Sequence, residues 1–401
     1  MECKICNENS DLILSLDNGS AVSSLGKVLE AEANIYLCSK CSHCQTNPSI
    51  DLFEYYSNKY KTLSVSFAED DLYGYVDGMP VFRNLHQAKT LIKKLQNLDK
   101  ININNDAILD YGSGKSLIMK HLIEISGNEN VFLYDVSEDY IQYWDTFLPK
   151  SQYACFDLPA KWDGYFNLVT SFFSLEHVPD PKGDLNRIRQ LLKPDGYLYV
   201  IVPNMYSENA ADMLVIDHIQ HYSQASMNLL FNCCGFEMLE ADHFSHAQAS
   251  IYIGKVGFGN DVNSKADIPI FESFQKCKEI ASFWEYFPKS IHVFEEDMKA
   301  SHVDGYYIVG AGIIGTCIYL QLRYPELLLG FIDSNEHKQK KGWQGKEVFA
   351  PGVITGDKSH AVLCGFNRIQ LQTILSTLLP EGIPKNNVWS LSQAQSNNKS
   401  N

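Results

Sequence analysis

At 401 residues the chain is too long for one ordinary hydrophobic core, so its length predicts two or three domains. With 45% hydrophobic and 20% charged residues it has the composition of a soluble globular protein, and no apolar run approaches the roughly 18 to 20 residues that span a bilayer. The formal net charge of -15 argues against a protein that wraps nucleic acid, because neutralising phosphates requires clustered Lys and Arg.

The first elements are two cysteine pairs in an N-terminal module expected over residues 1–60. The opening "MECKICNENS" lacks a basic stretch followed by an apolar one, which predicts a cytoplasmic protein, and in a reducing compartment the 11 cysteines are not a disulfide framework. Two C-x-x-C pairs can instead place four thiolates around one structural zinc, and these are Cys3, Cys6, Cys38 and Cys41. His43 or Cys44 is an alternative fourth ligand, and reduced surface cysteines are the alternative to a metal site. The other cysteines are expected in the core: Cys155, Cys233, Cys234, Cys277, Cys317 and Cys364.

Farther along, the pattern predicts an α/β fold. Apolar residues at helical spacing predict a helix over 81–95. Short apolar runs then alternate with helical segments, as in an open parallel sheet, and these runs are "AILDYG", "VFLYDV", "FNLVTSFF" and "GYLYVIVPN". A last strand and a linker follow, and then a long helix over 271–299. The runs "YYIVGAG", "LLGFIDS" and "HAVLCGF" predict a second parallel sheet. We therefore expect a central domain over 61–255, a C-terminal Rossmann-like domain over 256–390 and a disordered tail over 391–401.

A first glycine turn follows the strand "AILDY". The strand ends near Asp110, and Gly112 and Gly114 allow a ligand to approach the backbone. Asp135 ends the next strand, where a carboxylate can accept hydrogen bonds from both ribose hydroxyls. This pattern predicts an adenosine-containing ligand, and the missing third glycine argues against a dinucleotide. A tight turn that serves packing alone is the alternative.

The motifs that follow carry a family resemblance. Asp157 in "CFDLP" follows the third strand, and "FFSLEHVPDP", "LLKPDGYLYVIVPN" and "DHIQHYSQASMNLLFNCCGFE" come after it in that order. This succession resembles the class I S-adenosylmethionine-dependent methyltransferases over residues 106–237. The resemblance implies a Rossmann-like methyltransferase domain that binds S-adenosylmethionine through Asp110, Gly112, Gly114, Asp135, Asp157 and Glu176.

The whole architecture resembles a narrower group, the three-domain sugar C-methyltransferases, which combine an N-terminal zinc-binding domain, a methyltransferase domain and a C-terminal Rossmann-like domain. The resemblance implies a nucleotide-linked sugar or a related glycan or secondary-metabolite precursor as the acceptor. It leaves open whether carbon or oxygen is methylated and whether the protein is a monomer or a homodimer.

A second glycine turn, "VGAGIIGT", is a complete G-x-G-x-x-G with Gly310, Gly312 and Gly315, and Asp333 follows near the end of the next strand. The resemblance implies that this domain holds the nucleotide part of the substrate. A purely structural or dimer-forming role and a dinucleotide site are the alternatives. The basic stretch over 337–346 is expected to contact a phosphate or to be a solvated loop.

Methyl transfer requires an aligned acceptor and a group that removes its proton, a task suited to a histidine with a pKa near neutrality. His218 is the candidate base, with Asp217 to fix its tautomer, His221 to orient it and His177 as the second candidate. In the sugar C-methyltransferases a Glu-His pair with a Tyr two residues before the Glu occupies this place, whereas here the pair is Asp217-His218 and Val215 replaces the Tyr. Histidines that only fix a loop are the alternative.

An aromatic stretch before the central domain is expected either to cap the active site or to belong to the core. Its candidate substrate contacts are Tyr73, Tyr75, Arg83 and His86. The sequence thus predicts a methyltransferase that acts on a small molecule, without nucleic acid or membrane. The competing hypothesis is an NAD-binding oxidoreductase-like or non-catalytic protein that uses the "GAGIIG" turn.

Overall fold

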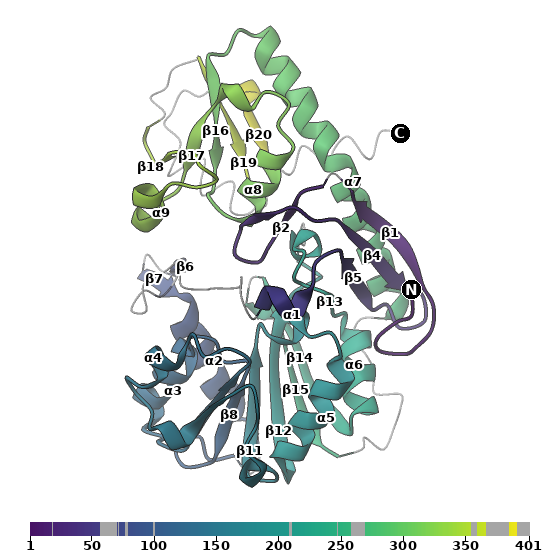
Figure 1. Ribbon diagram of the computed structural model, residues 1–401, viewed down its shortest axis with the longest axis vertical. Coiled ribbons are helices and arrows are strands. Elements are labelled where there is room, and N and C mark those ends of the chain that lie inside the picture. The colour runs from purple at the N-terminus through teal and green to yellow at the C-terminus, as the bar shows by residue number, and fades with distance from the viewer. Residues whose placement is uncertain are drawn as a thin grey trace.

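The computed structural model describes residues 1–17, 19–56, 70, 72–76, 79–98, 101–207, 211–246, 248–257, 269–353, 359–365 and 385–390. The expected disordered tail over 391–401 lies outside these residues. Figure 1 shows the central domain at the bottom of the view, the C-terminal domain at the top and the N-terminal module beside both.

The central domain is built on a seven-stranded sheet in the order β10-β9-β8-β11-β12-β15-β14 (Figure 1). β10, β9, β8, β11 and β12 run parallel, and β15 and β14 are antiparallel to their neighbours, so the sheet is mostly parallel as predicted. The strands are β8 (Ile108–Tyr111), β9 (Val131–Asp135), β10 (Tyr153–Cys155), β11 (Phe166–Phe172), β12 (Leu192–Pro203), β14 (Phe236–His246) and β15 (Ala249–Val256). Their apolar residues are buried on both faces, which explains the near-continuous hydrophobic runs in the sequence.

Helices cover both faces of this sheet (Figure 1). One apolar cluster joins the sheet to α2 and α3, and a second joins it to α5 and α6. The helix expected over 81–95 is confirmed with its start at Arg83. The helices are α2 (Arg83–Leu95), α3 (Leu117–Ser126), α4 (Ile141–Trp144), α5 (Pro181–Leu191) and α6 (Gln224–Cys233). Short 3₁₀ turns occupy Lys150–Gln152, Ala160–Trp162, Leu175–His177 and Ala211–Leu214.

The prediction of one last strand in this domain was wrong. β14 and β15 form an antiparallel hairpin that adds two strands to the sheet beside β12. β14 lies at the sheet edge, and most of its side chains remain partly exposed. The polar residues of "EADHFSH" therefore give no strand pattern in the sequence.

The N-terminal module is a four-stranded antiparallel sheet in the order β1-β4-β5-β13. Its edge strand β13 comes from the central domain, so the expected boundary near residue 60 does not separate two independent sheets. The strands are β1 (Ser10–Leu16), β4 (Ala33–Cys38), β5 (Cys44–Pro48) and β13 (Gln220–His221). Three smaller elements occur before α2. They are the hairpin β2 (Ala21–Val22)–β3 (Val28–Leu29), the helix α1 (Leu52–Glu54) and the hairpin β6 (Leu72–Val76)–β7 (Met79–Phe82).

The C-terminal domain is a five-stranded parallel sheet in the order β18-β17-β16-β19-β20. The three predicted parallel strands are confirmed as β16, β17 and β19. The elements are α7 (Ile270–Ala300), β16 (Gly305–Val309), α8 (Ile313–Leu320), β17 (Leu328–Ile332), α9 (Glu336–Lys341), β18 (Val348–Phe349), β19 (His360–Cys364) and β20 (Val388–Ser390), with 3₁₀ turns at Pro325–Leu327 and Lys385–Asn387.

The long helix α7 unites the N-terminal sheet and the C-terminal domain (Figure 1). One apolar cluster contains residues of β1 and β4, of α7, and of the C-terminal sheet, so these parts share a core. No helix among the described residues is long and apolar enough to cross a membrane. Two cysteines expected in the core are not fully buried, because Cys233 is exposed at the end of α6 and Cys155 is half-buried at the edge strand β10.

Candidate active site

A cleft of about 1700 Å³ opens between the central and the C-terminal domains. Its walls come from three distant parts of the chain: the hairpin loop 24–28, the carboxyl ends of the central strands, and the C-terminal segment 335–344. In an open α/β sheet, ligands bind at the carboxyl ends of the parallel strands, which is where this cleft lies. The cleft is therefore the place to look for the predicted site residues.

The first glycine turn forms one wall of the cleft. Gly112 has φ +77°, and a Cβ at this position would lie 2.1 Å from Ser174 Oγ, so no larger residue fits without a shift. Gly114 has φ +50° and has open space where a Cβ would be. The turn thus combines a backbone that needs glycine with an open approach for a ligand.

Two buried carboxyl groups organise this turn. Asp110 accepts hydrogen bonds from Thr170 Oγ1 at 2.8 Å and Ser116 Oγ at 3.1 Å, and burial raises its pKa to about 7. Asp135 accepts hydrogen bonds from Gly114 N at 2.8 Å and Ser137 N at 3.0 Å, and burial raises its pKa to about 6. Both line the cleft, so the structure brings Asp110, the glycines and Asp135 together.

Two exposed apolar side chains flank Asp135 in the cleft wall. Val136 and Phe156 are 54% and 55% exposed and both line the cleft. Sequence reasoning missed them, because a single apolar residue after a strand does not distinguish a ligand contact from an ordinary exposed side chain. Asp157, which was expected to bind S-adenosylmethionine, is exposed and is not among the described residues that line the cleft.

The turn Leu175–His177 after β11 carries a second group of side chains into the cleft. The turn ends at "VPDP", where Asp180 caps α5 and accepts a hydrogen bond from Gly183 N at 3.1 Å. The backbone oxygen of Glu176 accepts a hydrogen bond from Ile219 N at 2.8 Å, which holds the segment of His218 against the turn. As a result, the rings of His177 and His218 pack edge to face with centroids 4.8 Å apart.

Glu176, His177 and His218 all line the cleft, and each has an unusual environment. Glu176 is 1% exposed, neither side-chain oxygen has a hydrogen-bond partner among the described residues, and burial raises its pKa to about 7. Burial lowers the pKa of His177 to about 4. Burial opposes the charged form of His218 as well, but the carboxylates of Asp212, Glu176 and Asp217 together outweigh it, so the pKa of His218 is raised.

The acid beside His218 is Asp212, which sequence reasoning missed. Asp212 Oδ1 lies 3.5 Å from His218 Nδ1, and Asp212 also lines the cleft. Asp217, the predicted partner, is fully buried and its carboxylate accepts hydrogen bonds from Ser24 N at 2.7 Å and Ser24 Oγ at 2.6 Å. Asp217 contacts His177 through its backbone oxygen, which accepts a hydrogen bond from His177 Nδ1 at 2.8 Å, while its carboxylate lies 4.0 Å from the same nitrogen.

A tyrosine of the N-terminal module completes this arrangement. Tyr56 OH donates to Asp217 O at 3.0 Å and lies 2.7 Å from His177 Nδ1. Tyr56 lines the cleft but stands outside the stretch chosen as a lid from the sequence. The segment "LFEYYSNKY" contains several tyrosines, and no motif in it distinguishes a tyrosine of the site from one of the core.

His221 lies apart from the cluster. Its Nε2 is 2.8 Å from Thr46 Oγ1, it belongs to β13 at the edge of the N-terminal sheet, and it is not among the described residues that line the cleft. Arg83 lines the cleft and its guanidinium lies 4.5 Å from the centroid of the Phe173 ring. His86 bonds through Nε2 to the backbone oxygen of Ser245 at 3.1 Å. Tyr73 and Tyr75 belong to β6, and their side chains lie outside the described residues.

The second glycine turn is largely occupied by contacts within the protein. Asp333 accepts hydrogen bonds from Ala311 N at 3.0 Å and Lys338 Nζ at 3.2 Å, and a Cβ on Gly315 would lie 2.0 Å from Gly310 O. Gly315 is therefore required for the packing of the helix on its strand. Among the glycines of the fingerprint, only Gly312 is one of the described residues that line the cleft.

The basic stretch that follows β17 lines the same cleft as the first glycine turn. His337, Lys338 and Lys341 line the cleft from α9, and Trp343 and Gln344 line it from the following loop. Gln344 Nε2 also donates to Gly26 O at 2.6 Å, and Trp343 Nε1 donates to Thr316 Oγ1 at 2.9 Å, so the hairpin loop and the C-terminal domain meet here.

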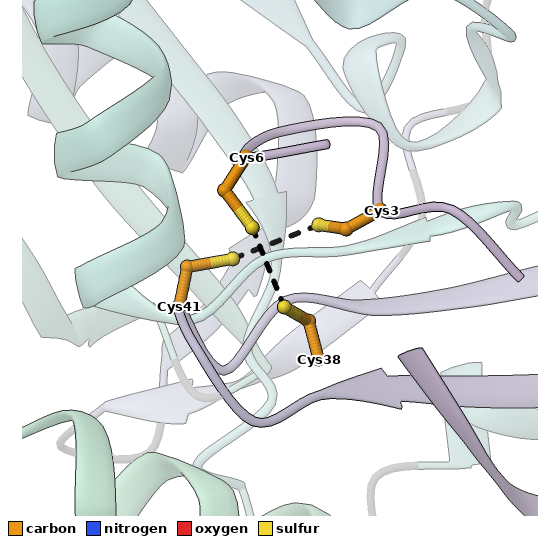
Figure 2. Close-up of side chains that lie close together, drawn as sticks. All are labelled: Cys3, Cys6, Cys38 and Cys41. Atoms are coloured by element: carbon orange, nitrogen blue, oxygen red, sulfur yellow. Dashed lines mark hydrogen bonds between the residues drawn. The ribbon is translucent and has the colours of Figure 1, made fainter. Parts of the chain in front are cut away.

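The four predicted cysteine ligands lie together, as Figure 2 shows. Cys3 Sγ is 3.6 Å from Cys41 Sγ, Cys6 Sγ is 3.4 Å from Cys38 Sγ, and all four sulfur atoms lie within 4.8 Å of one another. Sulfur atoms at tetrahedral corners with Zn–S bonds of about 2.3 Å are roughly 3.8 Å apart, so the donor set and spacing fit zinc. His43 and Cys44 are not part of this cluster; His43 Nε2 instead lies 2.8 Å from Gln220 Oε1.

Comparisons with known proteins agree on the central part of the chain. The sequence profile of a methyltransferase domain matches residues 83–241. Juvenile hormone acid O-methyltransferase of Drosophila melanogaster is 26% identical over 207 residues, which are 47% of this chain and 67% of that protein. An uncharacterized methyltransferase of Schizosaccharomyces pombe is 25% identical over 196 residues, 42% of this chain and 67% of that protein. The structure of a SAM-dependent methyltransferase from Aquifex aeolicus is similar with a TM-score of 0.34 and 15% identity, covering 43% of this chain and 91% of that one.

Proposed function

Because the central part of the chain is an S-adenosylmethionine-dependent methyltransferase domain, we propose that the protein transfers a methyl group to a nucleotide-linked sugar or a related phosphorylated precursor bound in the cleft. One observation carries this proposal: the glycine turn of the central domain and the basic residues of α9 in the C-terminal domain line the same cleft. The first wall suits an adenosine-containing donor, and the second suits an anionic acceptor.

The donor wall is formed by the glycine turn, Asp135, Val136 and Phe156. The free lone pairs of the Asp135 carboxylate can accept hydrogen bonds from two ribose hydroxyls, because a carboxylate has about four acceptor positions and two are used by backbone N–H groups. Val136 and Phe156 offer apolar surface to the adenine ring beside it. When bound, S-adenosylmethionine supplies an electrophilic methyl group and its own leaving group.

The acceptor wall gives the second glycine domain a role other than dinucleotide binding. Lys338 and Lys341 can neutralise the phosphates of a nucleotide, and Trp343 beside them offers a ring for stacking. The carboxylate of Asp333, which a dinucleotide would need for its ribose, already accepts hydrogen bonds from Ala311 N, Asn335 N and Lys338 Nζ, and unlike Asp135 it is not among the described residues that line the cleft. These contacts favour a substrate-holding domain over an NAD site.

For the acceptor's proton, we propose His218 as the base. It lies in the cleft, its Nδ1 faces Asp212 at 3.5 Å, and a ring held in this way presents Nε2 as the acceptor nitrogen. Asp212 thereby takes the orienting role that the sequence gave to Asp217. The His177 ring packs against His218 and is itself fixed by Asp217 O and Tyr56.

We propose a structural zinc at the four-cysteine cluster. The cluster is buried beneath the central domain, where Cys3, Cys38 and Cys41 belong to the same apolar core as α5 and α6. Four thiolates leave no open position for a substrate, so the metal serves folding and the docking of the N-terminal module.

A screen of nucleotide sugars with isotope-labelled S-adenosylmethionine, read by mass spectrometry, tests this function. The expected result is a labelled methyl group on at least one nucleotide-linked sugar, with S-adenosylhomocysteine as the second product. Calorimetric titration with S-adenosylhomocysteine and with NAD separates the competing hypothesis, because binding of NAD alone would contradict a methyl-donor site.

A further inference from the structure

Three side chains in the cleft have the composition of a divalent-metal site. Glu176 and His177 follow one another on the turn after β11, and His218 reaches them from the segment before β13. One ligand atom from each lies within 4.8 Å of the others. In an octahedral site with bonds of about 2.1 Å, neighbouring ligand atoms are about 3 Å and opposite ones about 4.2 Å apart, so a small closure of the group encloses an ion.

Glu176 is the observation that points to a bound cation. Its carboxyl group is 1% exposed, lines the cleft, and has no hydrogen-bond partner for either oxygen among the described residues. A buried carboxylate without a partner costs several kcal/mol, and proteins that retain one usually pair it with a cation. Arg83 contributes some attraction through space, and the histidines His177 and His218 each have a ring nitrogen within 4.8 Å of a carboxylate oxygen of Glu176.

The histidines are held by partners of the kind that metal-binding histidines use. The backbone oxygen of Asp217 can only accept, so His177 carries its proton on Nδ1 and presents an unprotonated Nε2. Asp212 lies 3.5 Å from Nδ1 of His218 and favours the same arrangement there. A carbonyl or carboxylate behind the ring fixes the tautomer and raises the basicity of the ligating nitrogen.

We propose that Glu176, His177 and His218 bind a divalent first-row transition-metal ion whose open coordination positions face the cleft and take oxygen atoms of the acceptor. Two imidazoles and one carboxylate with open positions suit ions such as Mn²⁺, Fe²⁺ or Zn²⁺ better than Mg²⁺ or Ca²⁺, which prefer oxygen ligands throughout. The acceptor that fits is one with two neighbouring oxygens, a vicinal diol or a hydroxyketone, as sugars provide. This deepens the proposed function and rests on it for the identity of the acceptor.

When the metal ion is bound, His218 cannot act as the general base, because the ring nitrogen that binds the ion has no lone pair left to accept a proton. The acceptor O–H bond then breaks with loss of the proton to solvent, since a bound cation lowers the pKa of the hydroxyl. The freed oxygen bonds to the methyl carbon, and the electron pair of the S–CH₃ bond stays on sulfur, so the step is transfer to oxygen. In the metal-free enzyme His218 remains the base.

Titration with Mn²⁺, read by electron paramagnetic resonance, tests the site. The protein is first depleted of metal and reloaded with one equivalent of zinc per chain, which the four-thiolate cluster takes up first. Mn²⁺ is the probe because it prefers carboxylate and imidazole over the four-thiolate cluster. The parent protein is expected to bind one Mn²⁺ per chain at the cleft. Glu176→Gln and His218→Ala should each weaken binding at least tenfold, and Glu124→Gln, at an exposed carboxyl on α3, should leave it unchanged.

Stoichiometric binding that Glu176→Gln and His218→Ala leave unaffected would overturn the site, as would the absence of binding to the parent protein. Thermal unfolding and the affinity for S-adenosylhomocysteine show whether each variant is folded. If a variant does not fold, the Mn²⁺ titration of the parent protein still tests the proposal. Methyl transfer that proceeds equally well in protein reloaded with the structural zinc alone also contradicts the site, while leaving the proposed function intact. Mn²⁺ binding without transfer to any nucleotide-linked acceptor would instead contradict the proposed function alone.

Discussion

Asp135 combines a structural and a ligand-binding task at one residue. Its carboxylate holds the backbone of Gly114 and Ser137 and lines the cleft at the end of β9. Burial raises its pKa to about 6, above the value of the unfolded chain. The contribution of this group to the free energy of unfolding is therefore present at acidic pH and is lost as the pH rises through about 6.

The affinity for the methyl donor should change with pH in the direction opposite to this stability contribution. A protonated Asp135 has fewer acceptor positions for the ribose hydroxyls, so we expect S-adenosylhomocysteine to bind more weakly at pH 5 than at pH 7.5, by up to about tenfold. Calorimetric titrations at the two values measure this. In Asp135→Asn most of this pH dependence should disappear; the same pH dependence in parent and variant would contradict the assignment.

Gly112 tests the turn itself. A side chain at this position meets Ser174 Oγ at 2.1 Å and must adopt φ +77°, so Gly112→Val is expected to abolish S-adenosylhomocysteine binding. Gly164→Val is the matched control, because Gly164 also has positive φ but has no atoms within 4 Å and lies outside the described cleft lining. Parental affinity in Gly112→Val would place the donor elsewhere.

His218 is the residue on which turnover should depend most. His218→Ala is expected to leave the affinity for S-adenosylhomocysteine nearly unchanged and to lower kcat on the order of 10²- to 10⁴-fold, the range for loss of a general base. His302→Ala, at an exposed histidine, is the control. Steady-state kinetics with the acceptor found in the screen measures both variants, and a parental kcat in His218→Ala would transfer the role to His177.

At the scale of elements, the two cysteine pairs show what a local sequence pattern can predict and what it cannot. The spacing predicted the four ligands, and they lie together because the loop before β1 and the turn after β4 face each other across the module. The sequence did not predict that β13 completes the N-terminal sheet, because an edge strand of two residues has no periodicity of its own.

Zinc removal should therefore affect more than a small module. Cys38→Ser is expected to lower the zinc content below one per chain and to lower the melting temperature, since binding free energy is folding free energy at such a site. Cys233→Ser, at an exposed cysteine, should change neither. Metal analysis with thermal unfolding measures both, and full zinc occupancy in Cys38→Ser would exclude a four-thiolate site.

At the scale of the whole molecule, the two glycine turns are joined by a short hairpin. The Ser24 backbone and hydroxyl bond to the carboxylate of Asp217, and the backbone oxygen of nearby Gly26 accepts from Thr316 and Gln344 of the C-terminal domain. Asp217 in turn holds His177 through its backbone oxygen. The N-terminal module thereby connects the acceptor wall of the cleft to the histidines.

These long-range contacts mark the limit of the sequence-based prediction. The strands, the glycine turns and Asp135 were predicted because each depends on residues close together in the chain. The partner of His218 was assigned to Asp217 by adjacency, whereas the fold places Asp212 beside the ring and turns Asp217 toward Ser24. The location of residues from 337–346 in the cleft wall also required the fold, because the sequence alone did not show what this basic stretch lies against.

The central claim is that donor and acceptor meet in one cleft with a wall from each domain. A transfer assay with labelled S-adenosylmethionine and the nucleotide sugar found in the screen tests it when the KM of each substrate is measured separately. Asp135→Ala should raise the KM for the donor, reflecting a loss of roughly 1.5 to 3 kcal/mol, and leave the KM for the acceptor near the parental value. Lys338→Ala combined with Lys341→Ala should do the reverse. Methyl transfer in the double lysine variant with parental KM values for both substrates would contradict the shared cleft.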